Sequence, residues 1–428
     1  MIVEPLFKNV EEVYDFLDSR NKYGSQLGLE TMEIMMSRLG HPENLTYTIH
    51  IAGTNGKGSV GAYLSSILRQ GRCVAFHFSS PAVFHPREVW RRCCLSIGDF
   101  ELIQAASRVY EVTTDLDKYN IHPTRFEVET AIAICGPTVF GDRVLILETG
   151  MGGAEDATNI VPRPDITAFT NIGYDHMQFL GNTLTEIATV KAGIIKPACP
   201  VFSATQVPEV KAVLDEKVIC EEVNYVDDSS LELISIKAGE MKFRYRGQEY
   251  ETPLASICQM QNAALAIDIA RYMKYPDELI VKGIKEVVWH GRFEVLSKEP
   301  YFIIDGAHNV HAVQQLAETI KIGFTNQRFN FIIGVLKDKE HEKMMEIMAP
   351  FANRIFTVTP PNERGLDAKI LAEEIKQWHE DVVSCDSIEE AVNLAMDYGR
   401  ETGDITLAFG SLSYLGDVKK YHDIYLKK

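Results

Sequence analysis

The amino-acid sequence predicts an α/β protein with two doubly wound domains, each built on a mostly parallel sheet with helices on both faces. The chain has 428 residues, 46% of them hydrophobic, which suits two buried cores better than one. Short apolar runs alternate with helical patterns, as is typical of parallel strands joined by crossover helices. This alternation begins again after Phe293. We therefore expect one domain over residues 1–294 and a second over residues 295–428.

The sheet of the first domain is predicted from apolar runs bounded by turn residues. These runs are Thr46–Ala52, Cys73–Phe78, Val144–Glu148, Ile166–Asn171 and Pro200–Ala204. Their nearly continuous hydrophobic character is typical of strands that are covered by helices on both faces. Between Leu231 and Tyr250 apolar and polar residues alternate, which predicts a small antiparallel hairpin appended to the main sheet.

The second domain is predicted to be Rossmann-like. Its strand candidates are "YFIIDGA", "FNFIIGV", "RIFTVTP" and "DITLAFG", with helical patterns between them. We place the domain boundary near Val295–Pro300 and expect a hinge there. The sequence contains no low-complexity tract and no repeat of solenoid period.

Composition and charge disfavour nucleic-acid-binding, membrane-associated and disulfide-bonded proteins. A formal net charge of −17 disfavours binding to nucleic acid or to an anionic membrane surface. The 8 cysteines contain no C-x-x-C pair, which favours a reduced cytoplasmic protein. The N-terminus does not read as a signal peptide, and no stretch approaches the roughly 18 apolar residues of a spanning helix.

The segment "HIAGTNGKGS", residues His50 to Ser59, is the first candidate site. A strand leads into a glycine-rich turn, and the helix that follows holds Ser59 in its first turn. Backbone N–H groups and the positive helix end would then surround one point, as in a P-loop ATPase-like domain. Lys57 would neutralise the β and γ phosphates. Gly58, however, separates Lys57 from Ser59 where the common loop has none, so a glycine-rich turn without a ligand is the alternative.

A second motif, "VLILETGMGGAEDATNIV", begins with the third predicted strand of the first domain. Glu148 ends this strand, and in open α/β sheets ligands collect at the carboxyl ends of strands, so Glu148 is well placed to hold Mg²⁺. The alternative is a strand-end acid that caps the next turn. Asp175 and His176 follow the next strand, and Lys191 lies fifteen residues further on. Charged and imidazole side chains at consecutive strand ends of one sheet indicate a functional site at that edge of the sheet.

Together, GTNGKGS, ETGMGGAEDATN and DH followed by KAGIIKP resemble the folylpolyglutamate synthase and dihydrofolate synthase family, a branch of the Mur ligase superfamily. The resemblance runs through almost the whole chain. Its further motifs are "YGSQLGLETMEIMMSRLGHPE", "RFEVETAIAI", "QMQNAALA", "WHGRFEV", "IDGAHNVHA", "GVLKDKE" and "GSLSYLG". In that family Lys-Gly-Ser is the usual form of the loop.

The resemblance implies a set of site residues. ATP would be bound by Gly53, Thr54, Asn55, Gly56, Lys57, Gly58 and Ser59, and by Asn262, Arg292 and Asp305. Mg²⁺ would be bound by Ser80, Glu148 and His176. Lys57, Lys191 and His308 would be catalytic, with His308 helping to place the incoming amino acid.

The reaction implied by the resemblance is amide formation. A pteroate or folate carboxylate attacks the γ-phosphorus of ATP, and the amine of L-glutamate then attacks the resulting acyl phosphate. The resemblance also suggests that Lys191 is carbamylated; the alternative is an ammonium group that binds the γ-phosphate. We expect the protein to be a monomer.

This chain departs from the family pattern at Ala82, Val89 and Cys258. The changes bear on how the pterin-bearing substrate is held and on whether one or both family reactions occur. Two rival functions are another Mur ligase acting on a cell-wall precursor and a non-catalytic ATP-binding regulator. The first should carry a Lys-Thr-Thr or Lys-Thr-Ser loop and an extra N-terminal domain. A glutamate-dependent ATP turnover assay distinguishes the second from an enzyme, because a non-catalytic regulator would show no turnover.

Overall fold

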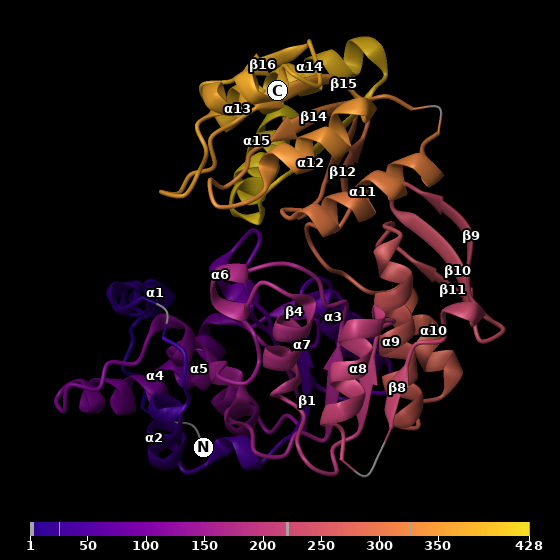
Figure 1. Ribbon diagram of the computed structural model, residues 1–428. Coiled ribbons are helices and arrows are strands. Elements are labelled where there is room, and N and C mark those ends of the chain that lie inside the picture. The colour runs from indigo at the N-terminus through magenta and orange to yellow at the C-terminus, as the bar shows by residue number, and fades with distance from the viewer. Residues whose placement is uncertain (1–3, 25, 220–221, 326, 428) are drawn as a thin grey trace. The chain divides into compact units, whose positions relative to one another are not determined.

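The computed structural model describes residues 4–24, 26–219, 222–325 and 327–427 (Figure 1). Cys220 lies outside these ranges, and the described cysteines carry free thiols. The chain forms two compact units. The first comprises Met1–Ala82, Arg87–Ser229 and Gln261–Val287, and the second comprises Val83–Pro86, Ser230–Met260 and Val288–Lys428. None of the described helices is long and apolar enough to cross a membrane.

An eight-stranded sheet with the order β4-β3-β2-β5-β1-β6-β7-β8 forms the centre of the first unit. Its parallel strands are β1 (Tyr47–Ala52), β2 (Ala75–Phe78), β5 (Val144–Glu148), β6 (Ile166–Phe169), β7 (Val201–Ser203) and β8 (Val223–Tyr225). The short strands β3 (Trp90–Arg92) and β4 (Leu95–Ser96) add to one side in antiparallel pairing. The predicted parallel strands of the first domain are thus confirmed.

Helices cover both faces of this sheet. They are α1 (Val10–Ser19), α2 (Glu30–Leu39), α3 (Lys57–Gln70), α4 (Asp99–Asp117), α5 (Arg125–Phe140), α6 (Met177–Leu180), α7 (Leu184–Ala192), α8 (Pro208–Lys217), most of α9 (Cys258–Tyr272) and α10 (Asp277–Lys285). One apolar core joins α1, α2, α4 and α5 to β2 and β5. Another joins α7 and α8 to β6 and β7. Burial of both sheet faces explains why the strands read as continuous apolar runs.

Local sequence signals set the ends of the helices that matter for the site. The Thr183 side chain accepts a hydrogen bond from the backbone N–H of Glu186, and the Glu186 carboxylate accepts from Thr183 in return, so a capping box begins α7. Thr124 and Glu127 form the same motif at the start of α5. Helix α3 begins after Gly56, whose φ of 92° lies in the left-handed region.

The second unit contains a small antiparallel sheet of three strands, β9 (Leu231–Lys237), β10 (Glu240–Tyr245) and β11 (Gln248–Thr252). The predicted antiparallel hairpin is confirmed and extended by one strand. The prediction that it is appended to the main sheet of the first domain is wrong, because these strands form a separate sheet in the second unit. This part of the chain packs against α11 (Val310–Gly323). A Cβ on Gly323 would lie 2.9 Å from Ile236, and Ser256 is hydrogen-bonded to Thr319.

The larger sheet of the second unit has the order β12-β13-β17-β14-β15-β16. Its strands are β12 (Glu294–Lys298), β13 (Tyr301–Ile304), β14 (Phe329–Ile333), β15 (Ala352–Thr357), β16 (Val382–Ser384) and β17 (Ile405–Phe409), and only β12 pairs in antiparallel fashion. The helices around it are α11, α12 (His341–Met348), α13 (Ala368–Ile375), α14 (Ile388–Thr402) and α15 (Leu415–Tyr425) (Figure 1). Residues 295–300 form most of β12 and the turn into β13.

Candidate functional site

The carboxyl ends of the central strands of the first sheet meet at one edge. Ile51 of β1 pairs with Glu148 of β5, and Phe78 of β2 pairs with Leu147 of β5. Segments that leave these strands therefore begin side by side. This edge carries the loop after β1, the Ser79–Ser80 segment after β2, Glu148 itself and, after β6, the segment that contains His176.

The loop between β1 and α3 is held close to its neighbours. Gly53 has φ 147°, and a Cβ there would lie 1.8 Å from the hydroxyl oxygen of Thr170. A Cβ on Gly56 would lie 2.4 Å from the side-chain oxygen of Asn262. Both positions thus need glycine, because of the backbone angle and because of the space. The structure brings Asn262 of α9 against the loop, as the predicted nucleotide site requires.

Thr54 ties the loop to the segment that follows β6. The Thr54 backbone N–H donates to the Asn171 carbonyl at 2.8 Å. The Thr54 hydroxyl donates to the Gly173 carbonyl at 3.0 Å and accepts from the Gly173 N–H at 2.9 Å. These contacts fix Thr54 and leave the following turn to present its backbone at the start of α3.

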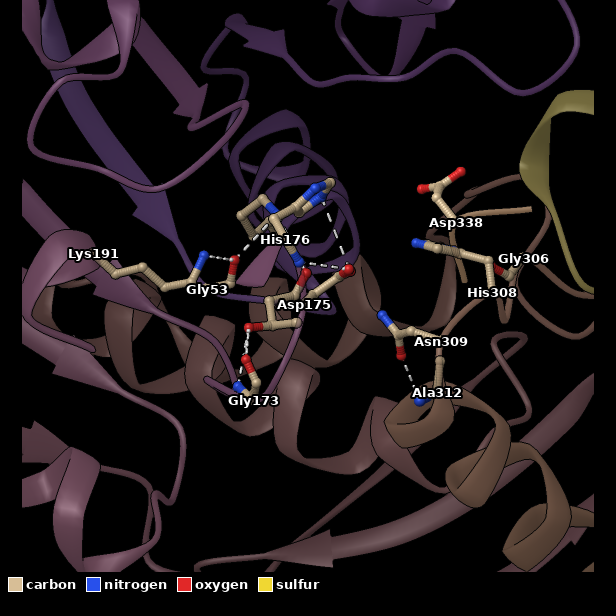
Figure 2. Close-up of polar contacts among 12 residues, drawn as sticks. Gly53, Gly173, Asp175, His176, Lys191, Gly306, His308, Asn309, Ala312 and Asp338 are labelled. Carbon is tan, nitrogen blue, oxygen red and sulfur yellow. Dashed lines mark hydrogen bonds and ion pairs between the residues drawn. The ribbon is translucent and has the colours of Figure 1, made fainter. Parts of the chain in front are cut away.

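Two lysines donate to the same backbone carbonyl. Lys191 Nζ lies 2.9 Å from Gly53 O, and Lys57 Nζ lies 3.2 Å from it (Figure 2 shows the Lys191 contact). Lys57 Nζ also lies 3.7 Å from a carboxylate oxygen of Glu148. Glu148 is buried, with 5% of its surface exposed, so its charge acts at short range on Lys57. The predicted residues Lys57, Glu148 and Lys191 are thus placed around one point of the loop.

Lys191 is unusual because it is a buried lysine. Only 4% of its surface is exposed. Burial lowers its pKa to about 7, with a further lowering by the charge of Lys57, while Asp175 and Asp156 act in the opposite direction. Burial thus favours the uncharged amine of Lys191, the state that nucleophilic chemistry of the side chain requires.

The segment after Glu148 packs tightly against α7, the helix that carries Lys191. The Ala154 N–H donates to the Val190 carbonyl at 2.9 Å, and a Cβ on Gly153 would lie 2.6 Å from the Lys191 carbonyl oxygen. A Cβ on Gly193 would lie 2.4 Å from the Cβ of Ala154. Small residues thus allow the backbones to approach each other and to set the position of Lys191.

A series of hydrogen bonds between buried side chains connects this segment to β1. His50 Nε2 lies 2.9 Å from the Thr158 hydroxyl, which donates to the Asp156 carboxylate at 2.5 Å. Burial raises the pKa of Asp156, and hydrogen bonds from Thr158 and Met151 oppose that rise. Neither His50 nor Thr158 is among the predicted site residues. The signal that could identify them is a polar pair inside otherwise apolar or glycine-rich motifs.

His176 follows β6 and has a left-handed backbone, with φ 51°, at the start of α6. Its N–H donates to the Asp175 carboxylate at 2.9 Å, and its ring is partly exposed (Figure 2). Among the described residues, no group of three or more His, Cys, Asp and Glu side chains is arranged to hold a metal. The predicted Mg²⁺ set contains only two residues of these types, with Ser80 as the third ligand. A buried carboxylate plus hydroxyl oxygens at adjacent strand ends does suit Mg²⁺, which usually binds one or two carboxylates together with substrate phosphates and water.

The predicted residues of the second unit gather after β13. Asp305 is buried, and its carboxylate accepts hydrogen bonds from the N–H groups of Phe293 and Ala307, each at 2.8 Å. Burial raises its pKa, and the nearby charge of Arg292 opposes that rise. A Cβ on Gly306 would lie 2.2 Å from the Arg292 guanidinium. Arg292 and Asp305 thus lie in one cluster, and their role in nucleotide binding stays a prediction.

His308 and the start of α11 extend this cluster. His308 Nδ1 lies 2.7 Å from the Gly306 carbonyl oxygen (Figure 2). Since a carbonyl can only accept, Nδ1 carries the proton and Nε2 is left as the acceptor of the neutral ring. Asn309 caps α11 by accepting from the Ala312 N–H at 2.9 Å.

The three positions at which the sequence departs from the family pattern lie in ordinary packing environments. Val89 is buried in the core around β2 and β5, and Ala82 packs against the edge of that core. The Cys258 thiol lies 3.5 Å from the Ser256 hydroxyl, and burial raises the pKa of this thiol.

The fold and the site define an α/β protein with a glycine loop between a parallel strand and a helix, and with lysines and a buried acid at that loop. Two family comparisons agree with this class. The Mur ligase middle domain matches residues 137–270, and the Mur ligase glutamate ligase domain matches residues 291–412.

Curated relatives and solved structures cover nearly the whole chain. It is 33% identical to the dihydrofolate synthase/folylpolyglutamate synthase of Bacillus subtilis, over 97% of this chain and 99% of that protein. It is 28% identical to the enzyme of the same name from Escherichia coli, over 95% of this chain and 94% of that protein. The E. coli FolC structure with DHPP and ADP matches with a TM-score of 0.86 at 25% identity, over 99% of this chain and 100% of that one. The chain belongs to the dihydrofolate synthase/folylpolyglutamate synthase family of the Mur ligase superfamily.

Proposed function

We propose that this protein is an ATP-dependent ligase that joins the amine of L-glutamate to a folate-type carboxylate, giving an amide, ADP and phosphate. The observation that carries the proposal is the loop Gly53–Ser59, where Lys57 and Lys191 converge on one carbonyl beside the buried Glu148. The names of the relatives, and the DHPP and ADP in the E. coli structure, support folate or dihydropteroate and ATP as substrates.

The reaction needs two bond changes at the carboxylate. A carboxylate oxygen of the folate-type substrate attacks the γ-phosphorus, and the bond to the ADP oxygen breaks. The unprotonated glutamate amine then attacks the acyl carbon through a tetrahedral intermediate, the nitrogen loses one proton to solvent, and the bond to phosphate breaks. The first step is required because a carboxylate oxygen is a poor leaving group until it is phosphorylated. Lys57 and the N–H groups at the start of α3 would stabilise the charge on the transferring phosphoryl group.

Mg²⁺ would be held by Ser80, Glu148 and His176. When bound, this ion would neutralise phosphate charge and orient the phosphate oxygens. Glu148, which is buried, would supply the charged oxygen ligand that Mg²⁺ prefers.

We further propose that Lys191 is carbamylated. Formation of a carbamate joins the amine nitrogen to the carbon of CO₂ and releases one proton, so it requires the uncharged amine. Burial favours that form of Lys191, since it lowers the pKa to about 7. The modification would replace a cation near the phosphate and metal site with an anion that can accept from water or contact a cation.

The remaining assignments rest on the family and on the cluster in the second unit. Arg292 and Asp305 would complete nucleotide binding, and His308 would place the glutamate. We assign ATP binding mainly to residues 1–294 and glutamate ligation to residues 295–428. A monomeric state and a cytoplasmic location also stay predictions; size-exclusion chromatography with light scattering tests the former.

The test is incubation of the purified protein with ATP, Mg²⁺, L-glutamate and either 7,8-dihydropteroate or a reduced folate, with ADP release and product mass as readouts. The expected product is the substrate plus one or more glutamyl residues. ATP binding without glutamate-dependent ADP release would instead identify a non-catalytic regulator. ADP release without any glutamylated folate would point to another Mur ligase activity.

A further inference from the structure

His50 is a fully buried histidine in the middle of β1, three residues before the loop. Its exposed surface is 0%, and it lies on the strand that leads directly to Gly53. Its ring nitrogen Nε2 lies 2.9 Å from the hydroxyl oxygen of Thr158, which belongs to the short helix Ala157–Ile160. Burying an imidazole costs free energy unless its nitrogen atoms form hydrogen bonds. The contact with Thr158 therefore offsets part of the cost of burying His50.

The direction of the hydrogen bonds follows from proton counting. The Asp156 carboxylate accepts from the Thr158 hydroxyl at 2.5 Å, from the Thr158 N–H at 3.0 Å and from the Met151 N–H at 2.7 Å. Because the Thr158 hydroxyl has one proton and gives it to Asp156, its oxygen must accept from His50. We therefore assign the proton of neutral His50 to Nε2. In the described part of the chain, Nδ1 has no hydrogen-bond partner.

The same residues continue to Lys191. Asp156 holds the Met151 N–H, and the Asp156 N–H donates to the Gly153 carbonyl at 3.1 Å. The Ala154 N–H donates to Val190 in α7, directly before Lys191, at 2.9 Å. A continuous series of hydrogen bonds thus runs from β1 through Thr158 and Asp156 to the helix that carries Lys191.

We propose that His50 and Thr158 are positioning residues: they hold Asp156 so that the segment 151–156 fixes Lys191 relative to the loop carbonyl of Gly53. This inference rests on the proposed function, since it assigns Lys191 a role in the ligase reaction. Neither His50 nor Thr158 touches the reacting atoms; both act through Asp156 and through the backbone of α7.

Paired substitutions separate the hydrogen bond from the packing. Thr158→Val removes the hydroxyl at nearly constant volume, whereas Thr158→Ser keeps it. His50→Leu removes the donor, whereas His50→Gln can place an amide N–H near the position of Nε2. Thr130→Val is the matched control, because Thr130 is equally buried in α5 and its hydroxyl has no hydrogen-bond partner in the described part of the chain.

We expect kcat to fall by about 10–100-fold in Thr158→Val and His50→Leu, in line with losses for residues that orient functional groups. KM for ATP should change by less than about threefold, because the backbone of the loop stays in place. Thr158→Ser, His50→Gln and Thr130→Val should keep kcat within about threefold of the wild type. Wild-type kcat in folded Thr158→Val and His50→Leu would overturn the proposal.

Two readouts do not depend on turnover. Hydrogen exchange should speed up in residues 150–157 of Thr158→Val but not in β1, because Met151 loses its fixed acceptor. In wild-type protein with ¹⁵N-labelled histidine, His50 should appear as the neutral Nε2–H form between pH 5 and pH 8. A ring that carries its proton on Nδ1, or that titrates in this range, would overturn the proposal even if every variant failed to fold. Failure of the proposed function is a separate result, namely no glutamate-dependent ADP release by the wild type.

Discussion

At the scale of single residues, the site is defined by two lysines that share one acceptor. Both Lys57 and Lys191 donate to the carbonyl of Gly53, and a lysine side chain fixed in this way has already lost much of its rotamer entropy. Such preorganisation reduces the conformational entropy that is lost when a ligand binds. The two lysines differ in environment, however, since Lys57 is half-buried next to Glu148 and Lys191 is almost completely buried.

Lys57→Ala should abolish turnover and change the free energy of unfolding by about 1 kcal/mol or less, because Lys57 contacts the loop and Glu148 rather than an apolar core. Steady-state ADP release and urea denaturation measure the two effects. Lys282→Ala, at an exposed lysine of α10, is the control. A folded Lys57→Ala protein with near-normal kcat would remove the nucleotide-loop assignment.

Glu148→Gln should raise the Mg²⁺ concentration needed for half-maximal activity while the fold stays intact. The amide keeps the shape of the carboxylate but loses the charge that a hard cation needs. A Mg²⁺ titration of activity, with circular dichroism as the check on folding, tests this expectation. An unchanged titration would leave Glu148 as a strand-end acid that pairs with Lys57.

Lys191→Ala should lose most activity, and the small molecule that restores it identifies the functional form of the side chain. Formate or acetate should restore part of the rate if a carbamate anion is required. Alkylamines should do so if an ammonium group binds the γ-phosphate. Mass spectrometry of native protein in bicarbonate gives an independent check, since a carbamate adds the mass of CO₂ at Lys191.

At the scale of elements, the start of α3 decides where phosphates could bind. The four N–H groups of a first helical turn have no partner within the helix, and the positive helix end favours anions. Gly56 directly precedes this turn, with φ 92° and with Asn262 against it. The element therefore needs a glycine at this position both for its backbone conformation and for the approach of α9.

Gly56→Ala should weaken ATP binding beyond the effect of backbone strain alone. Strain at positive φ costs about 1–2 kcal/mol, and the new Cβ would also displace Asn262, since it would lie 2.4 Å from its side-chain oxygen. Gly40→Ala provides a matched control, because Gly40 has φ 81° and open space around its Cβ position. Calorimetry with ATP should show a loss of affinity in Gly56→Ala only; equal affinity in both variants would contradict the role of this glycine.

The sequence predicts the long elements well and the short ones poorly. The runs at Val144–Glu148 and Phe329–Ile333 are apolar because both sheet faces are covered, and this signal is strong. Strand β16 has three half-buried residues and β12 lies at the sheet edge, so neither produces a comparable pattern. The alternation over Leu231–Tyr250 likewise does not distinguish the third strand of the small sheet, β11, from its neighbours.

In the candidate site, too, the sequence predicts some features and not others. Glycine loops and strand-end acids are visible in a sequence because they break the apolar pattern. Lys57 and Lys191 do donate to one carbonyl, and Glu148 lies beside Lys57. Contacts between segments more than a hundred residues apart, such as that of His50 with Thr158, depend on the arrangement of the sheet. A sequence pattern alone does not encode those pairs.

At the scale of the whole molecule, buried histidines link stability to pH. In the folded protein, burial lowers the pKa of both His50 and His77 to about 3, from 6.5 when unfolded. The unfolded chain therefore binds more protons between pH 6.5 and pH 3, so stability falls as the pH drops through this window. Together the two imidazoles can contribute a slope of up to about 2.7 kcal/mol per pH unit.

We expect His50→Gln and His77→Gln each to reduce that slope by up to one proton. Urea denaturation between pH 7 and pH 4, with the variants compared with the wild type, measures it. Buried carboxyl groups with raised pKa, such as Asp156 and Asp305, act with the opposite sign, but they are common to all three proteins and cancel in the comparison. Identical slopes in all three proteins would mean that the two histidines have the same pKa in the folded protein as in the unfolded chain.

The first unit is not continuous in the chain, and this affects how the protein can be made. Its last part, Gln261–Val287, follows the strands of the small sheet, which belong to the second unit. This part supplies Asn262, which lies against Gly56, and α10, where the Gly283 carbonyl accepts a hydrogen bond from Ser66 at 2.7 Å. During synthesis on the ribosome, the phosphate-loop segment therefore emerges long before its partners in α9 and α10. A nascent chain that ends before Gln261 has the loop but lacks Asn262 and α10, so we expect ATP to stabilise the first unit fully only after translation has passed Val287.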